Sequence, residues 1–162
     1  MRQKFLRLWS ILTVALLMSL MTVASAVAQK PEAKAIFGGE VGIDTLKFID
    51  PWQYTSKLTD PWAPPPVSTF NVGDPLWMHL FINTDAPKTV SATYLLKNLG
   101  SGPKFKVFKN DFALPNAGNW RLSLGWPNGV PNELVGTWKL IGIVKSGDER
   151  SICRKPWEFT VR

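Results

Sequence analysis

The sequence contains one cysteine, Cys153, and one histidine, His79, in 162 residues. A single cysteine excludes an intrachain disulfide and a cysteine-based zinc site, and a single histidine excludes a blue-copper centre. A copper(I) site would need Met78 beside His79, but neighbours in a strand face opposite sides. We therefore predict no metal and no cofactor. Cys153 is either a plain thiol or, with basic residues close in sequence to lower its pKa, a redox-active one.

The sequence also lacks the signatures of an enzyme. No serine stands in a nucleophile-elbow motif, and no glycine-rich phosphate loop is present. Asp50, Asp60 and Asp74 each precede a proline, a position typical of turns. Because His79 has apolar neighbours in its expected strand, we expect a hydrogen-bonded structural residue rather than a catalytic base. The prediction is a protein without enzymatic activity and without catalytic residues.

The first 28 residues contain no acidic residue, and their three basic residues lie within Met1–Arg7. An apolar stretch, Ile11–Met21, and a run of small residues, Thr22–Ala28, follow. This order is typical of a signal peptide, here cleaved after Ala28, and it predicts a periplasmic or secreted protein. The alternative is an uncleaved membrane anchor, because Leu8–Ala28 carries no charge.

Removal of that segment changes the charge of the chain. The formal net charge of +7 falls to +4, since three basic residues and no acidic ones are lost. A nucleic-acid partner is therefore not expected. All 12 glycines and 13 prolines remain after residue 28, which argues against long helices and for short strands with many turns.

Alternation of apolar and polar residues predicts about seven strands and therefore an antiparallel β-sandwich. Leu76–Ile82 is apolar on both faces, which indicates a central strand. The other expected strand regions are Val41–Ile49, Val90–Leu96, Lys104–Lys109, Trp120–Trp126, Thr137–Val144 and Ser151–Val161. Gln29–Lys34 is expected to be a flexible leader, and a slip in alternation predicts a bulge near Asp44–Thr45.

The end of the chain carries a recognisable pattern. A strand with the sequence Gly136-Thr137-Trp138-Lys139-Leu140 is followed by a turn and then by Trp157-Glu158-Phe159-Thr160-Val161. This resembles the last hairpin of bacterial immunoglobulin-like and fibronectin-type domains. The resemblance implies an immunoglobulin-like sandwich over about 70–162. The signal peptide (1–28) and a strand with a connection rich in proline and tryptophan (29–69) precede this part of the chain. We expect 29–162 to fold as one unit.

Aromatic residues are the most suggestive candidates for a binding site. Asp50–Val67 contains two Asp-Pro-Trp triplets and three consecutive prolines, which predicts a long connection that is neither helix nor central strand. Its aromatic residues could bind a protein, stack on sugar rings, or fold back to plug the sandwich. The candidate binding residues, on this connection and near turns, are Trp52, Tyr54, Trp62, Trp126 and Trp157.

A second candidate group is basic. Lys97, Lys104, Lys106 and Lys109 could bind an anionic partner, with Lys104 and Lys106 on one face. The other interpretation is an edge strand that lysines protect against aggregation.

These features together predict an exported, non-enzymatic domain that docks on another envelope or secreted protein. The aromatic connection and two rim loops, Asn110–Asn119 and Pro127–Val135, would form the contact surface. The alternative is a carbohydrate-binding module in which surface tryptophan and tyrosine side chains stack on a glycan. A membrane is expected as a partner only if the N-terminal segment stays uncleaved.

Overall fold

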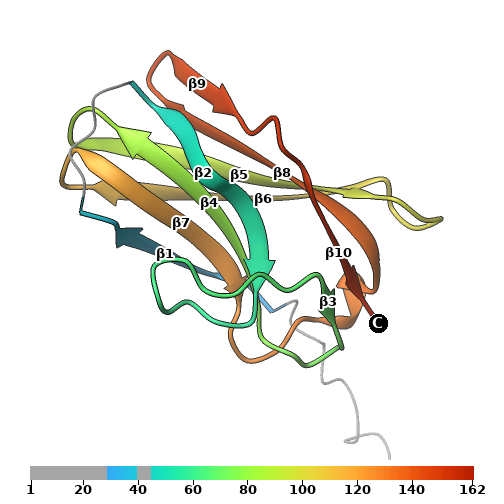
Figure 1. The fold of residues 1–162 in the computed structure, drawn as a ribbon. Coiled ribbons are helices and arrows are strands. Elements are labelled where there is room, and N and C mark those ends of the chain that lie inside the picture. The colour runs from blue at the N-terminus through green and yellow to red at the C-terminus, as the bar shows by residue number, and fades with distance from the viewer. Residues whose placement is uncertain (1–28, 40–44) are drawn as a thin grey trace, which may run out of the picture.

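The computed structural model describes residues 29–39 and 45–162, which form an all-β sandwich of two sheets (Figure 1). The predicted signal peptide lies outside the described residues. The strands are β1 (Glu32–Phe37), β2 (Lys47–Ser56), β3 (Thr69–Phe70), β4 (Leu76–Thr84), β5 (Lys88–Asn98), β6 (Phe105–Leu114), β7 (Gly118–Trp126), β8 (Gly136–Ser146), β9 (Glu149–Ile152) and β10 (Trp157–Val161), with a short 3-10 helix at Asn132–Leu134. Ten strands are therefore described rather than the seven expected.

The four-stranded sheet has the order β1-β7-β4-β2. All nine residues of β4 are buried, which confirms the prediction of a central strand covered on both faces. The expected flexible leader is wrong from Glu32 onward, because β1 pairs with β7 and places Glu32 opposite Gly125. Backbone pairing to a buried strand thus orders a segment whose own composition gives little sign of it.

Strand β2 corrects the prediction for the proline-rich region. The segment Asp50–Ser56 belongs to this strand, so the long connection begins only at Lys57. The proline of this strand, Pro51, is tolerated because β2 lies at the edge of its sheet, where a missing backbone donor breaks few hydrogen bonds. The register shifts between Phe48 and Gln53, so the described irregularity lies later than the one expected near Asp44–Thr45; residues 40–44 lie outside the described residues.

The six-stranded sheet has the order β3-β10-β8-β5-β6, with β9 also paired to β8. The predicted closing hairpin is confirmed as an antiparallel pair in which Trp138 faces Phe159. The expected single strand Ser151–Val161 is instead two strands, β9 and β10. The sandwich is also not wholly antiparallel, because β10 pairs parallel with β3.

The core lies between the inner faces of the two sheets. It is built from alternate residues of β4, β5, β7 and β8, together with Phe70 and Phe159 from the end of the six-stranded sheet. The rings of these two phenylalanines meet edge to face, with 6.2 Å between their centroids. Strand β6 lies at the edge of its sheet, as expected for the lysine-rich strand, but it extends to Leu114. Among the described residues, no helix is long and apolar enough to cross a membrane.

Candidate functional site

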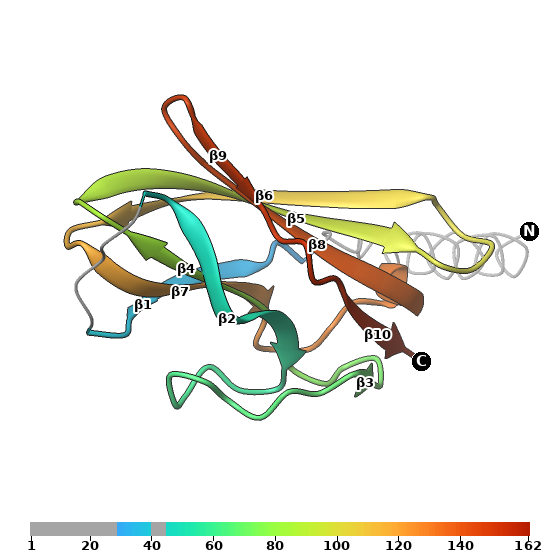
Figure 2. The ribbon, with the colours of Figure 1, turned by 45° about the horizontal axis from the view of Figure 1, so that its top comes forward.

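The outer face of the four-stranded sheet is covered by Lys57–Ser68, which we call the cover segment. Figure 2 shows it in green after β2, on the side of the four-stranded sheet away from β5 and β6. Trp62 packs edge-to-face on Phe81, with 5.6 Å between ring centroids. Phe81 is completely buried although it lies on an outer face. This corrects the expectation of a free aromatic arm and agrees with the alternative in which Trp62 folds back.

Arg121 fixes the cover segment to the sheet. Its side chain is completely buried, and its guanidinium donates hydrogen bonds to the backbone carbonyls of Thr59, Pro61 (2.7 Å) and Trp62 (2.6 Å). Burial lowers the pKa of Arg121, while nearby Tyr54 and the Asp60 carboxylate oppose that shift. Three carbonyl dipoles thus stabilise the buried charge and hold the segment in place.

His79 lies beneath this cover, between two serines. Its Nε2 is 2.7 Å from Ser56 Oγ, and its Nδ1 is 2.8 Å from Ser123 Oγ. Since Ser56 Oγ donates to the carbonyl of Leu58, it accepts from His79 Nε2–H, and Ser123 then donates to Nδ1. Burial and, second, the charge of Arg121 lower the pKa of His79 to about 3. The expectation of a buried, hydrogen-bonded histidine is confirmed.

Cys153 is buried, and its Sγ lies 3.4 Å from the carbonyl of Lys155. Burial raises the pKa of the thiol, which outweighs the opposing effects of that hydrogen bond and of the Lys155 charge. The thiol is thus protonated at neutral pH, which argues against the redox interpretation. Among the described residues, no group of histidine, cysteine and carboxylate side chains could hold a metal ion.

We expect Cys153 in the folded protein to react with a thiol reagent such as DTNB roughly a hundredfold more slowly than in urea-unfolded protein, because only an exposed thiolate reacts quickly. The measurement is the rate of absorbance increase in both states. Equal rates would show that the thiol is accessible in the native fold.

The five aromatic candidates do not form one surface. Tyr54 is 4% exposed and Trp126 only 1%, so neither is a rim residue. Trp126 lies in the core against Phe108, with its indole nitrogen donating to the carbonyl of Gln29. The position of Trp126 beside a proline and a turn predicts a place at the rim. The alternation of β7 instead directs its side chain into the core between the two sheets.

The fold brings Trp52 and Tyr54 of β2 near Trp157, which begins β10 far along the chain. Tyr54 and Trp157 line a groove beside β2, and the ammonium of Lys155 lies 4.6 Å above the ring of half-buried Trp52. Of the sequence-based aromatic set, these three therefore share a place in the fold.

The outer face of the six-stranded sheet differs from that of its partner sheet. Val107, Leu95 and Ile141 stand side by side on β6, β5 and β8, and Ile143 and Ile152 follow on β8 and β9. Phe105, Val107 and Ile152 are 53%, 52% and 46% exposed. We call this apolar band and its basic border the uncovered face, which comprises Leu95, Lys97, Phe105, Val107, Lys109, Lys139, Ile141, Ile143, Lys145, Arg150 and Ile152.

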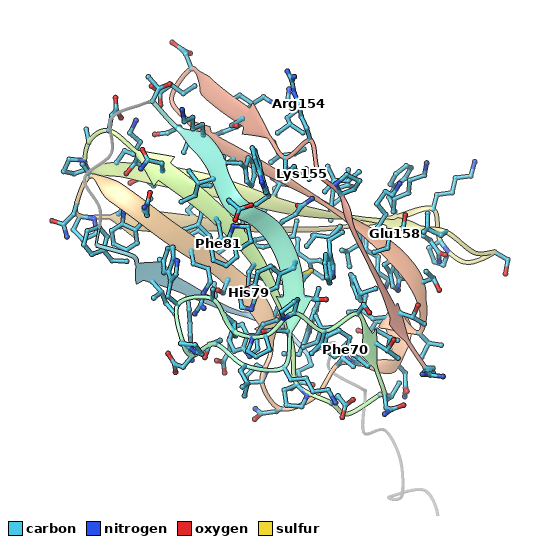
Figure 3. The ribbon with its side chains drawn as sticks, viewed as in Figure 1. Phe70, His79, Phe81, Arg154, Lys155 and Glu158 are labelled. Carbon is cyan, nitrogen blue, oxygen red and sulfur yellow. The ribbon has the colours of Figure 1, made fainter. Side chains whose placement is uncertain are left out.

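The basic residues of the uncovered face border the band along two rows. At one end, Lys97 on β5 lies opposite Lys139 on β8. At the other end, Lys145 on β8 lies opposite Arg150 on β9. The Lys139 ammonium lies 3.4 Å from the carboxylate of Glu158, which Figure 3 labels on β10. An apolar centre with a charged border has the composition of a protein-binding surface.

The four lysines of the predicted basic group do not lie on one face. Lys97 and Lys109 belong to the uncovered face. Lys106 is on the opposite face of β6, beside the core residue Leu96 of β5, and Lys104 lies in the turn before β6. The four lysines therefore do not form one patch. Successive side chains of a strand point to opposite faces of the sheet, and the register of the strands decides which of them lie side by side. Parity along β5 and β8 is the signal that could have found the uncovered face.

The two predicted rim loops have different outcomes. Asn110–Asn119 is mostly strand, since β6 ends at Leu114 and β7 begins at Gly118. Pro127–Val135 is a connection, as expected, but it contains the short 3-10 helix, and its Val130 and Leu134 are buried in the core.

No family model matches the chain, and no curated protein matches it. Among solved structures, it is similar to the Pseudomonas fluorescens alkylpurine DNA glycosylase AlkC bound to DNA containing an abasic site analog. The identity is 18% and the TM-score 0.39, over 59% of this chain and 28% of that one. It is also similar to Bacteroides uniformis beta-glucuronidase 2, with 11% identity and a TM-score of 0.43, over 70% of this chain and 14% of that one. The chain thus spans a minor part of both proteins, and these likenesses identify no family.

Proposed function

We propose that this chain is an exported, non-enzymatic, immunoglobulin-like β-sandwich that docks on another protein of the cell envelope through the uncovered face. One observation carries the proposal: within residues 29–39 and 45–162, one segment covers the outer face of one sheet, and an apolar band on the other sheet stays exposed. Exposed Phe105, Val107 and Ile152 cost free energy in water, and a partner that buries them would recover it.

The charges of this face indicate what the partner carries. Five basic residues border the band: Lys97, Lys109, Lys139, Lys145 and Arg150. The same face carries two carboxylates, Glu158, which lies opposite Lys139, and Asp111 on β6, so its net charge is still positive. Two copies facing each other would bring these cations together, so self-association through this face is disfavoured. The partner we propose is a protein with an apolar patch bordered by acidic residues.

A carbohydrate-binding module is the second candidate, and the grouping of Trp52, Tyr54 and Trp157 favours it. Sugar binding also needs several free polar groups beside the aromatic rings. The side-chain amide of Gln53, the one amide that lines the groove, is already bonded to the backbone of Leu140, Gly142 and Lys155. The groove therefore supports the glycan interpretation less well than the uncovered face supports protein docking.

Affinity capture from native envelope extract tests the main proposal. We expect the Phe105→Ser/Val107→Ser double variant to retain less than about a tenth of the partner captured by the unaltered protein, because apolar anchors at an interface centre carry most of its affinity. The charge variant Lys97→Glu should also lose the partner, by weaker electrostatic complementarity. Quantitative mass spectrometry of the captured proteins supplies the measurement.

Two matched controls accompany this test. Leu58→Ser removes an exposed apolar side chain from the cover segment, and Lys104→Glu reverses a charge in the β5–β6 turn. Both should capture the partner at the unaltered level. Capture by the double variant at that level would exclude the uncovered face, and tryptophan fluorescence that changes on titration with cell-wall glycans would favour the second candidate.

A further inference from the structure

A groove of about 390 Å³ lies between the edge strand β2 and the connection that joins β9 to β10. Figure 3 labels Arg154 and Lys155 on that connection. We call it the side groove, and its walls come from three parts of the chain. It is lined by Pro51, Gln53, Tyr54, Ala63, Pro64, Pro66, Lys155, Pro156 and Trp157.

The walls of the side groove are apolar and held in place. The rings of Tyr54 and Trp157 meet edge-to-face, with 6.1 Å between their centroids. The Trp157 indole nitrogen donates to Thr55 Oγ1 at 2.9 Å. Gln53 fixes the connection behind them. Its Nε2 donates to the carbonyl of Lys155 at 2.7 Å, and its Oε1 accepts from the backbone N–H of Gly142 at 2.7 Å. Because these aromatic side chains are already fixed, they lose little conformational entropy when a flat ring binds between them.

Two polar groups at the side groove still have capacity to bind. Tyr54 is nine-tenths buried or more, yet its hydroxyl has no hydrogen-bond partner within the described part of the chain. Lys155 forms no ion pair with any described carboxylate. Its ammonium instead lies above the ring of Trp52, whose φ of 74° is an uncommon, strained backbone conformation for a bulky residue. This conformation places an aromatic ring under a cation that a ligand could also bind.

From these contacts we infer that the side groove binds a small molecule with a planar apolar ring and one carboxylate. The ring would pack between Tyr54, Trp157 and the prolines, and the carboxylate would accept hydrogen bonds from Lys155. A cationic ligand would be repelled by Lys155. A sugar would find the amide of Gln53 already occupied. This site is separate from the uncovered face, so each proposal stands or fails on its own.

Titration of ¹⁵N-labelled protein with indole-3-acetate, followed by NMR, tests the inference. We expect dose-dependent shifts of the indole N–H signals of Trp52 and Trp157, with little change at Trp138 in the core. Acetate lacks the ring and tryptamine carries the opposite charge, so both should bind at least about tenfold more weakly. Equal binding of tryptamine would overturn the requirement for an anion, and shifts confined to other residues would exclude the groove.

Two variants assign the roles of the polar groups. Lys155→Gln removes the charge but keeps much of the side-chain length, and it should weaken indole-3-acetate binding about tenfold. Tyr54→Phe removes only the hydroxyl and should weaken binding about threefold. Lys109→Gln, a matched loss of charge on the uncovered face, should bind as the unaltered protein does. Unchanged affinity of Lys155→Gln, in a protein whose spectrum shows the native fold, would overturn the proposal.

Discussion

Replacing Arg121 by methionine is expected to lower the free energy of unfolding by about 3 kcal/mol. The substitution leaves the carbonyls of Thr59, Pro61 and Trp62 without their donor, and each unsatisfied buried acceptor costs about 1–3 kcal/mol. Part of this cost is offset, because the substitution also removes a buried charge that forms no direct ion pair among the described residues. Urea denaturation measures the change. The stability of Arg121→Lys should lie between that of the unaltered protein and that of Arg121→Met, since an ammonium cannot reproduce the guanidinium geometry.

The loss should concentrate in the cover segment. Because Arg121 holds Lys57–Ser68 against the sheet, the variant should be cleaved by protease within this segment under conditions in which the unaltered chain is protected. Lys57→Met, which removes only the exposed ion pair between Lys57 and Asp74 at 2.8 Å, is the control and should change stability by less than about 1 kcal/mol. An Arg121→Met protein with native stability and native protection would show that the hydrogen bonds from Arg121 to the three carbonyls do not stabilise the fold.

Arg121 also illustrates what the sequence can predict. In the run from Trp120 to Trp126 it reads as the solvent-facing position of an alternating strand, and the strand itself is confirmed. The pattern says which residues share a face but not whether a segment some 60 residues earlier covers that face. The pairing between Arg121 and the cover segment is a tertiary contact, so it leaves no local signal.

The strands with regular alternation are predicted well for the same reason. β4, β5 and β8 obtain their pattern from burial on one or both faces, which is a local property of their sequences. β1 and the second half of β2 lack that pattern, because each is ordered mainly by pairing to a buried neighbour at a sheet edge. Composition alone therefore favours a loop in both places.

The candidate surfaces were harder to predict than the strands. The aromatic residues Trp52 and Trp157 are in the predicted set, but Lys155 becomes relevant only once the β9–β10 connection is placed beside β2. The uncovered face likewise depends on the register that aligns Val107, Leu95 and Ile141. Register across three strands is set by turn lengths and packing that a sequence pattern does not specify.

Stability is expected to fall as the pH is lowered below about 6.5, at up to about 1.4 kcal/mol per pH unit, because of His79 alone. Its pKa is about 3 in the folded protein and about 6.5 in the unfolded chain. Between these values the unfolded chain binds a proton that the folded protein does not, so acid favours unfolding. The contribution is complete above pH 6.5, and about 2 kcal/mol of it is lost by pH 5.

The sole histidine makes this prediction specific. No other side chain has an ordinary pKa between about 5 and 8, and the lowered pKa values of the Asp74 and Asp85 carboxyls place their titration below that window. Urea denaturation at a series of pH values measures the slope. His79→Gln should be less stable than the unaltered protein at neutral pH, because it cannot satisfy Ser56 and Ser123 together as the ring does. It should nevertheless lose the dependence on pH between about 5 and 6.5. A slope that persists in this variant would show that another group titrates on unfolding, and a flat profile in the unaltered protein would show that His79 keeps its ordinary pKa beneath the cover segment.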